Sequence, residues 1–287
     1  MTKKIIIPSN KEQIENLMNY VDGFIVGLKD MSVNLPTYFS LFEIKEISEL
    51  LHKNNKELFV SLNKNMHNND LEYLKEVLLE FEKYNINGII YYDVSIINLK
   101  KELNLKNELV FSEEHAVTNY ATINYWNNMG AKYAYLSNEI TLNEIIDIHK
   151  NSNSKLFVQV FGYIPIFVSE RKLISNYKTY FNIDNKSDLY YIEKEEKKYP
   201  ILEDKYTTQV YSDYILNIID EIEKLKSENI EYIVYNSFNI NDDVFDYIIK
   251  RENIKDKDIK KLLNNVDKGF LYKETIYKVK KWKDQNC

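Results

Sequence analysis

Short apolar runs rich in β-branched and aromatic residues alternate with longer amphipathic stretches along this chain. The alternation constrains the fold strongly, because it is typical of parallel strands connected by helices. Eight such runs with helix-length segments between them predict an α/β fold of the (β/α)8 TIM-barrel type, which a chain of 287 residues can complete. The predicted strands are Lys4–Ile7, Gly23–Val26, Leu58–Leu62, Gly88–Tyr92, Leu109–Ser112, Tyr133–Leu136, Leu156–Val160 and Tyr232–Tyr235.

Helical periodicity is clearest in two segments, Leu71–Tyr84 and Tyr214–Leu225. In the first, leucines and a phenylalanine recur every three or four residues on one face. In the second, four isoleucines follow the same spacing. We expect a helix over each segment.

Two further segments depart from simple alternation. An insertion at about residues 164–212, after the seventh strand, contains DLYYIEKEEKKYPILE, which predicts a hairpin around Glu195–Lys197. In a barrel this insertion lies on the C-terminal face, where active sites collect. Residues of about 251–287 are expected to form a closing segment, first helical and then extended. No linker or repeat interrupts the chain, so residues 1–287 are interpreted as one barrel domain.

The net charge of −6 argues against a globally basic nucleic-acid-binding protein. The charge is uneven, because Lys250–Lys283 carries twelve Lys or Arg against five Asp or Glu, a balance of +7. Such a basic tail can contact RNA phosphates or an acidic partner. A solvated helix face has the same composition, so both interpretations stay open.

Cys287 is the only cysteine. One thiol cannot form a disulfide framework or a Cys-based zinc site, and it suits a cytoplasmic protein. No apolar run approaches the ~18 residues that span a bilayer, so we expect no membrane association. The sequence also contains no phosphate-cradling Gly-rich loop, nucleophile elbow or HExxH motif.

Polar residues follow several of the predicted strands. The carboxyl ends of barrel strands meet on one face, so we expect these side chains to converge there. The set consists of Asn63, His67, Asp93, Glu113, Glu114, His115, Asn119, Glu139, Tyr163 and Asn236.

Glu113–His115, after the fifth strand, is the best acid–base cluster. In extended chain Glu113 and His115 point to the same side, so we assign catalytic roles to these two and to Glu139. Glu139 has an alternative role in stabilising the next helix near Thr141, which forms a capping-box pattern with Glu144. A metal would need ligands from other strands that the sequence does not pair, so we predict none.

Arg171 is one of only two arginines in a lysine-rich chain, the other being Arg251. Its planar fork binds carboxylates and phosphates bidentately, which Lys cannot do. Arg171 therefore either holds an anionic ligand or forms a buried ion pair.

The segment around Arg171 resembles the signature of the collagenase-like peptidases, peptidase family U32. The matching residues are Phe161-Gly162-Tyr163, Ser169-Glu170-Arg171 and Leu173-Ile174-Ser175-Asn176-Tyr177. Further blocks are similar in the same order: NKNMHNNDL from Asn63, the stretch Thr118–Ile145, KYPILE from Lys198 and GFLYKETIYKVK from Gly269. From these blocks we assign substrate binding to Asn63, His67, Asn119, Tyr163, Ser169, Arg171 and Asn176.

The chain departs from the family pattern at several positions. Pro165 and Lys172 stand where long members carry two of the cysteines that, in some relatives, hold an iron–sulfur cluster. One cysteine cannot supply the four ligands of such a cluster, so we predict no resident cofactor. On the last strand, Val234–Phe238 replaces a charged Lys-Ile-Glu-Gly-Arg stretch.

The resemblance implies a role in RNA modification. Relatives are implicated in hydroxylating RNA bases, including the wobble uridine of tRNAs, with prephenate as a co-substrate. For this chain it implies tRNA uridine hydroxylation, tRNA as a partner and prephenate as a possible co-substrate gripped by Arg171. Two alternatives stay open: a non-catalytic subunit that pairs with a longer, cysteine-containing paralogue as a heterodimer, and the peptidase of the family name.

Overall fold

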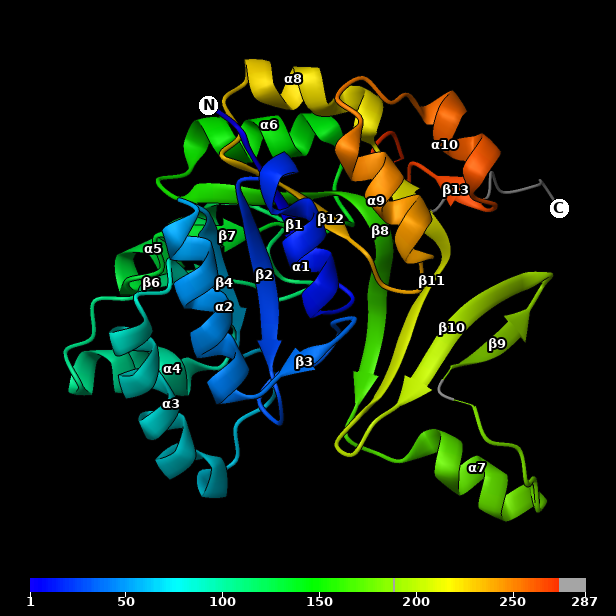
Figure 1. The fold of residues 1–287 in the computed structure, drawn as a ribbon, viewed down its shortest axis with the longest axis horizontal. Helices are drawn as coiled ribbons and strands as arrows, with labels where there is room; N and C mark the ends of the chain where they lie inside the picture. Colours follow the sequence, from blue (N-terminus) through cyan, green and yellow to red (C-terminus); the bar gives the residue numbers. More distant parts are fainter. Residues whose placement is uncertain (188, 274–287) are drawn as a thin grey trace, which may run out of the picture.

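A computed structural model of the chain describes residues 1–187 and 189–273. Eight parallel strands close into a barrel, because the last of them pairs with both the first strand and the seventh. Figure 1 shows this barrel with helices around it. The strands are β1 (Lys3–Ile7), β2 (Gly23–Leu28), β4 (Glu57–Ser61), β5 (Gly88–Tyr91), β6 (Glu108–Phe111), β7 (Tyr133–Tyr135), β8 (Lys155–Ser169) and β12 (Tyr232–Asn236). The predicted (β/α)8 architecture and all eight predicted strands are confirmed.

Amphipathic helices connect the strands and pack their apolar faces on the barrel. Local sequence signals set where several of them begin: Ser40 with Glu43, and Thr141 with Glu144, form capping boxes. The helices are α1 (Lys11–Leu17), α2 (Leu41–Lys53), α3 (Leu71–Tyr84), α4 (Val94–Glu102), α5 (Tyr120–Met129), α6 (Leu142–Asn151), α8 (Ile222–Ser227), α9 (Asp242–Lys250) and α10 (Asp256–Leu262). Among the residues described, no helix is long and apolar enough to cross a membrane.

Aromatic side chains fill the interior of the barrel. The ring of Phe157 stacks on Tyr232 at 4.1 Å between centroids, and Phe59 meets Phe157 edge-on at 5.0 Å. Ile5, Val110 and other buried aliphatic residues complete this layer. Beyond this packed layer, at the C-terminal end of the barrel, lies a cavity.

The insertion after the seventh barrel strand is confirmed and contains the predicted hairpin. β8 continues past the barrel rim and pairs antiparallel with β11 (Thr208–Asn217). β9 (Tyr190–Lys194) and β10 (Lys197–Glu203) form the hairpin, and Glu195 and Glu196 take positive φ in its turn. With α7 (Leu173–Phe181), these strands project from the barrel in Figure 1.

The predicted helix over Tyr214–Leu225 is wrong in its first half. Residues up to Asn217 belong to β11, a 3-10 turn covers Ile219–Glu221, and α8 begins only at Ile222. The four isoleucines are buried as the helical spacing implied. Isoleucine is β-branched and suits a strand equally well, so spacing alone did not decide the element.

Other short elements were not predicted. β3 (Tyr38–Phe39) pairs with β2, and β13 (Val266–Asp267) pairs with β11. The closing segment therefore begins with α10 and the β13 bridge, as a helical and then extended stretch. The remainder of the closing segment, residues 274–287, lies outside the described residues. It includes the end of the basic segment Lys250–Lys283 and Cys287.

Candidate functional site

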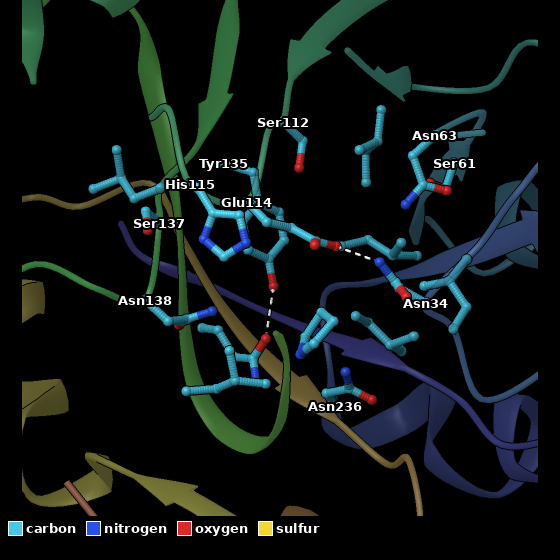
Figure 2. Close-up of a pocket in the computed structure, with 18 of the residues that line it drawn as sticks. Asn34, Ser61, Asn63, Ser112, Glu114, His115, Tyr135, Ser137, Asn138 and Asn236 are labelled. Atoms are coloured by element: carbon cyan, nitrogen blue, oxygen red, sulfur yellow. Dashed lines mark hydrogen bonds between the residues drawn. The ribbon is translucent and has the colours of Figure 1, made fainter. Parts of the chain in front are cut away.

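A polar cavity of about 70 Å³ opens at the C-terminal end of the barrel (Figure 2). Residues at or just after several barrel strands contribute to its lining, which explains why it is polar above an apolar core. These polar residues are Asn34, Ser61, Asn63, Ser112, Glu114, His115, Ser137, Asn138, Glu139, Gln159 and Asn236.

Glu114 occupies the centre of this lining. Its Oε1 accepts a hydrogen bond of 2.6 Å from Nδ2 of Asn34. Burial raises the pKa of Glu114 to about 7, against the opposing effects of the Asn34 hydrogen bond and of His115. Glu113 adds to the increase through its like charge. A carboxyl that titrates near neutrality is suited to proton transfer, and such groups gather at functional sites.

The backbone after β6 turns instead of staying extended. The N–H groups of Ala116 and Val117 both donate to the carbonyl of Glu113. The turn brings Glu114 and His115 together on the cavity, whereas Glu113 lines an adjoining hollow. The chain is therefore not extended here as we expected, but Glu113 and His115 still line one common hollow, together with Glu114.

Asn34 is held by the insertion. It lies in the loop after β2 with φ of 60°, a conformation that Asn tolerates. Its backbone N–H donates to Oε1 of Gln209 in β11 at 3.0 Å, and the Tyr211 hydroxyl donates to the same oxygen. Sequence reasoning missed Asn34, because its loop carries no pattern that points to the cavity.

His115 and Glu139 are hydrogen-bonded to each other at the cavity edge. His115 Nδ1 lies 3.2 Å from Glu139 Oε1, and both side chains are about half exposed. Thr141 supplies the N-cap of α6, so the alternative role of Glu139 as a cap is taken by another residue. The structure thus brings two of the three predicted catalytic residues into contact.

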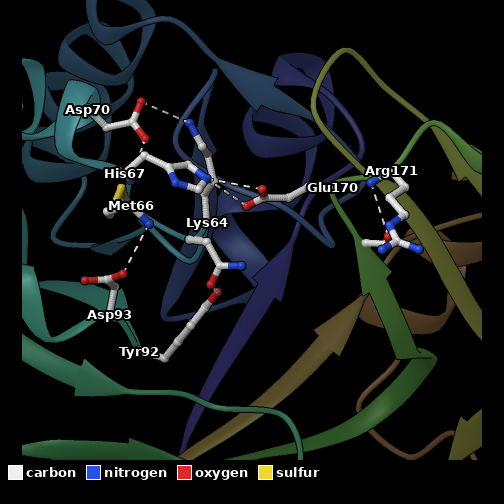
Figure 3. A network of polar contacts seen from close by, with 10 residues as sticks. Lys64, Met66, His67, Asp70, Tyr92, Asp93, Glu170 and Arg171 are labelled. Carbon is white, nitrogen blue, oxygen red and sulfur yellow. Dashed lines mark hydrogen bonds and ion pairs between the residues drawn. The ribbon is translucent and has the colours of Figure 1, made fainter.

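Asn63 and His67 lie on the loop after β4 but differ in their surroundings. Asn63 lines the cavity, and its amide exchanges two hydrogen bonds with the backbone of Val33, which fixes the loop after β2. His67 lies further out, and its Nε2 is hydrogen-bonded at 3.1 Å to the carboxyl of Glu170 in the insertion (Figure 3). His67 therefore ties the insertion to the barrel rim.

Of the seven predicted substrate-binding residues, Asn63 lines the cavity and the other six do not. Asn119 caps α5 by accepting from the N–H of Thr122. Tyr163 packs edge-on against Phe238. Ser169 accepts from the backbone N–H of Arg171, and Asn176 is exposed on α7.

Arg171 is exposed on the insertion, just past the end of β8 (Figure 3). Within residues 1–187 and 189–273, its guanidinium has no ion pair with a carboxylate. The backbone carbonyl of Arg171 accepts a hydrogen bond from the Thr208 hydroxyl. This bond fixes the backbone of Arg171 and does not involve its guanidinium. The buried ion pair that was one interpretation of Arg171 is therefore not found.

A second hollow, the insertion cleft, adjoins the cavity and shares several of its lining residues. It encloses about 300 Å³ between the barrel mouth and the outer part of β8. Its lining consists of Val33, Asn34, Asn63, Tyr92, Ser112, Glu113, Glu114, His115, Ile166, Phe167 and Val168. Across the described part of the chain, no three His, Cys, Asp or Glu side chains gather closely enough to hold a metal ion.

Comparison with known proteins places the chain in a family. The sequence profile described as peptidase family U32 matches residues 9–274. The chain belongs to peptidase family U32. Its fold is also that of a solved member: "The Structure of the U32 Peptidase Mk0906" superposes with a TM-score of 0.55 at 13% identity, over 83% of this chain and 93% of that one.

Three curated relatives of the U32 chain are similar in sequence. The tRNA hydroxylation protein P2 of Bacillus subtilis is 28% identical over 284 residues, which cover 89% of this chain and 92% of the relative. The tRNA hydroxylation protein P1 of the same organism is 24% identical, and the match covers 62% of this chain and 44% of that longer protein. The "Uncharacterized protease MJ0090" of Methanocaldococcus jannaschii is 28% identical, over 54% of this chain and 39% of the relative.

Proposed function

We propose that this U32 protein serves the hydroxylation of tRNA, at uridine, and that the barrel mouth is where the target nucleotide binds. The observation that carries the proposal is its similarity to the tRNA hydroxylation protein P2, which extends over nearly the full length of both chains. The match covers 89% of this chain and 92% of that protein.

Glu114 is the group on which the proposed chemistry depends. Its carboxyl lines the cavity and has a pKa that burial raises to about 7, so it can accept or donate a proton there. The pair of His115 and Glu139, 3.2 Å apart at the cavity edge, is a second place where a proton can be held. We therefore assign the proton-transfer role first to Glu114 and then to this pair.

Prephenate as a co-substrate stays a prediction. It is a dianion, and the cavity lining contains Glu114 and Glu139 but no Lys or Arg. Like charges in such a site repel an anionic ligand. The exposed fork of Arg171 on the insertion offers a better partner for a carboxylate.

Mass spectrometry of tRNA nucleosides tests the proposed function. The gene is deleted, together with the gene for any longer paralogue, and this chain is then expressed alone or with that paralogue. We expect a hydroxylated uridine to disappear on deletion and to return on expression. An unchanged set of tRNA nucleosides in the deletion strain contradicts the proposal.

Pairing with a longer paralogue is a related proposal. Bacillus subtilis contains two related proteins, P1 and P2, and this chain matches both. The helix α7 buries none of its residues and exposes Tyr177, Tyr180 and Phe181, a surface of the kind that subunits cover. A tagged chain should recover the paralogue from its own cells, and Tyr180→Glu should lower the recovery. Recovery of no paralogue at low salt contradicts the pairing.

A peptidase is the second candidate function, favoured by the name of the relative "Uncharacterized protease MJ0090". Peptide hydrolysis needs an activated nucleophile or a metal-bound water. We expect gelatin and casein to be digested no faster than in buffer. Digestion that a single substitution at Glu114 abolishes, with the fold intact, establishes the peptidase instead.

A further inference from the structure

Two different walls face each other across the insertion cleft. On one side lies the outer part of β8, where Ile166, Phe167 and Val168 are 37%, 46% and 39% exposed. On the other side lie the polar residues of the barrel mouth, among them Glu113 and Glu114. Exposed apolar residues that line a hollow are typical of ligand-binding surfaces.

The apolar wall suits a flat ring. Phe167 and Tyr92 both line the cleft, and aromatic side chains stack on nucleobases with little dependence on sequence. A space of about 300 Å³ lies within the range of small-molecule sites. One unstacked base with part of its sugar is a ligand of this size.

Asn34, which lines the cleft, carries a hydrogen-bond acceptor that has no partner among the residues described. Asn34 is only 6% exposed, and its Oδ1 has no hydrogen-bond partner within the described structure. The Nδ2 group of Asn34 already donates a hydrogen bond to the Glu114 carboxyl. An unsatisfied buried acceptor costs free energy, and an N–H group on the edge of a base can relieve that cost when the loop adjusts.

The charges around the cleft favour different positions for the base and the phosphate of a nucleotide. The cleft lining contains Glu113 and Glu114 and no Lys or Arg, so a phosphate is repelled from the interior whereas a neutral base is not. Two exposed cations belong to segments near the cleft residues: Arg171 follows Val168 closely in sequence, and Lys205 lies over the ring of Tyr206 at 4.7 Å. Lys64, next to the cleft residue Asn63, covers the same ring at 5.0 Å.

We propose that the insertion cleft binds one unstacked nucleobase of an RNA strand, with Phe167 against the face of the ring and the Glu114–Asn34 pair on its N–H edge. Arg171 and Lys205 contact the backbone phosphates outside the cleft. Phosphate contacts then position the strand, and contacts to the base select it. The inference rests on the proposed function, for which it identifies the residues that hold the substrate.

Photo-crosslinking and affinity measurements test this arrangement with an anticodon stem-loop RNA in which one loop uridine is replaced by 4-thiouridine. Irradiation with the full-length protein should attach the RNA to peptides that contain Phe167 or Tyr92. Phe167→Ala should weaken RNA binding about tenfold, as expected for loss of one stacked aromatic. Phe42→Ala, which removes an exposed aromatic from α2, should leave the affinity unchanged.

A crosslink that maps to the hairpin or to the closing segment overturns the inference, as does unchanged affinity in Phe167→Ala. These results are distinct from a failure of the proposed function. If the tRNA hydroxylation is lost on deletion and Phe167→Ala restores it fully, the function stands and the cleft is wrong. If deletion changes no tRNA nucleoside, the function itself fails.

Discussion

The Asn34 amide donates a 2.6 Å hydrogen bond to the Glu114 carboxyl across the mouth of the barrel. The bond joins the loop after β2 to the loop after β6. The side-chain oxygen of Gln209, in the insertion, accepts a hydrogen bond from the backbone N–H of Asn34 and so holds it in place. The insertion therefore orients Glu114, a carboxyl whose pKa burial raises to about 7. A substitution or movement in the insertion can therefore alter the position of the Glu114 carboxyl through Gln209 and Asn34.

The stability of the protein should depend on the ionisation of Glu114. Its folded pKa of about 7 lies above the unfolded value of 4.5, so the burial cost is absent at low pH, grows as pH rises from the unfolded to the folded pKa, and is fully present above about pH 7. We expect Glu114→Gln to raise the free energy of unfolding by about 2–3 kcal/mol at pH 8 and to change it little at pH 4. Urea denaturation at both pH values measures this.

Glu15→Gln is the matched control, because Glu15 is exposed on α1. It should shift stability by less than about 0.5 kcal/mol at either pH. Equal stabilities of wild type and Glu114→Gln at pH 8 contradict the assignment of a buried, neutral-titrating carboxyl.

Gly162 of the family signature has a backbone role that a substitution can isolate. Its φ is +113°, and a Cβ there would lie 2.3 Å from the carbonyl oxygen of Asn236 in the neighbouring strand β12. We expect Gly162→Ala to destabilise the protein by about 3 kcal/mol or more, through both strain and the clash.

Gly130 provides a comparison at the same φ of +113°, with no atom within 4 Å of an added Cβ. Gly130→Ala should cost only the backbone strain, about 1–2 kcal/mol. Thermal denaturation of the two variants gives the difference. Equal losses of stability show that β8 and β12 do not approach as closely at Gly162 as described.

The barrel was predictable because its strands alternate with helices in a regular way. The spacing of apolar residues along the sequence also predicts well which side chains are buried. The Tyr214–Leu225 segment shows the limit, since its isoleucines are buried in a strand, a turn and a helix alike. Glu114 and His115 were predictable as a cluster from their place after a strand. Asn34 was not, because its contact with Glu114 joins residues that only the closed barrel brings together. The interpretation of residues 1–287 as one domain stays a prediction.

Arg171 should be dispensable for stability. Its side chain is exposed and has no carboxylate partner in the described residues, so Arg171→Lys and Arg171→Ala should both leave the Tm nearly unchanged. Loss of a buried pair would instead cost about 3–5 kcal/mol. Both variants should bind the stem-loop RNA more weakly, since a point charge does not reproduce the bidentate fork. A strong fall in Tm with unchanged RNA binding shows a structural role.

The absence of an iron–sulfur cluster is a prediction from the cysteine count. Four ligands are needed, and the chain contains one cysteine, Cys287. Protein purified without oxygen should be colourless and should contain no stoichiometric iron or acid-labile sulfide. A broad visible absorption with about four irons per chain refutes this.

The central claim is that the barrel mouth around Glu114 is the functional site, and complementation with single variants tests it most directly. The deletion strain is supplied with wild type, Glu114→Ala or the control Phe42→Ala, and hydroxylated uridine in its tRNA is quantified by mass spectrometry. We predict full restoration by wild type and Phe42→Ala and a loss of at least about a hundredfold with Glu114→Ala at equal protein levels, the size expected for removal of an acid–base group. Restoration by Glu114→Ala to the wild-type level contradicts the account.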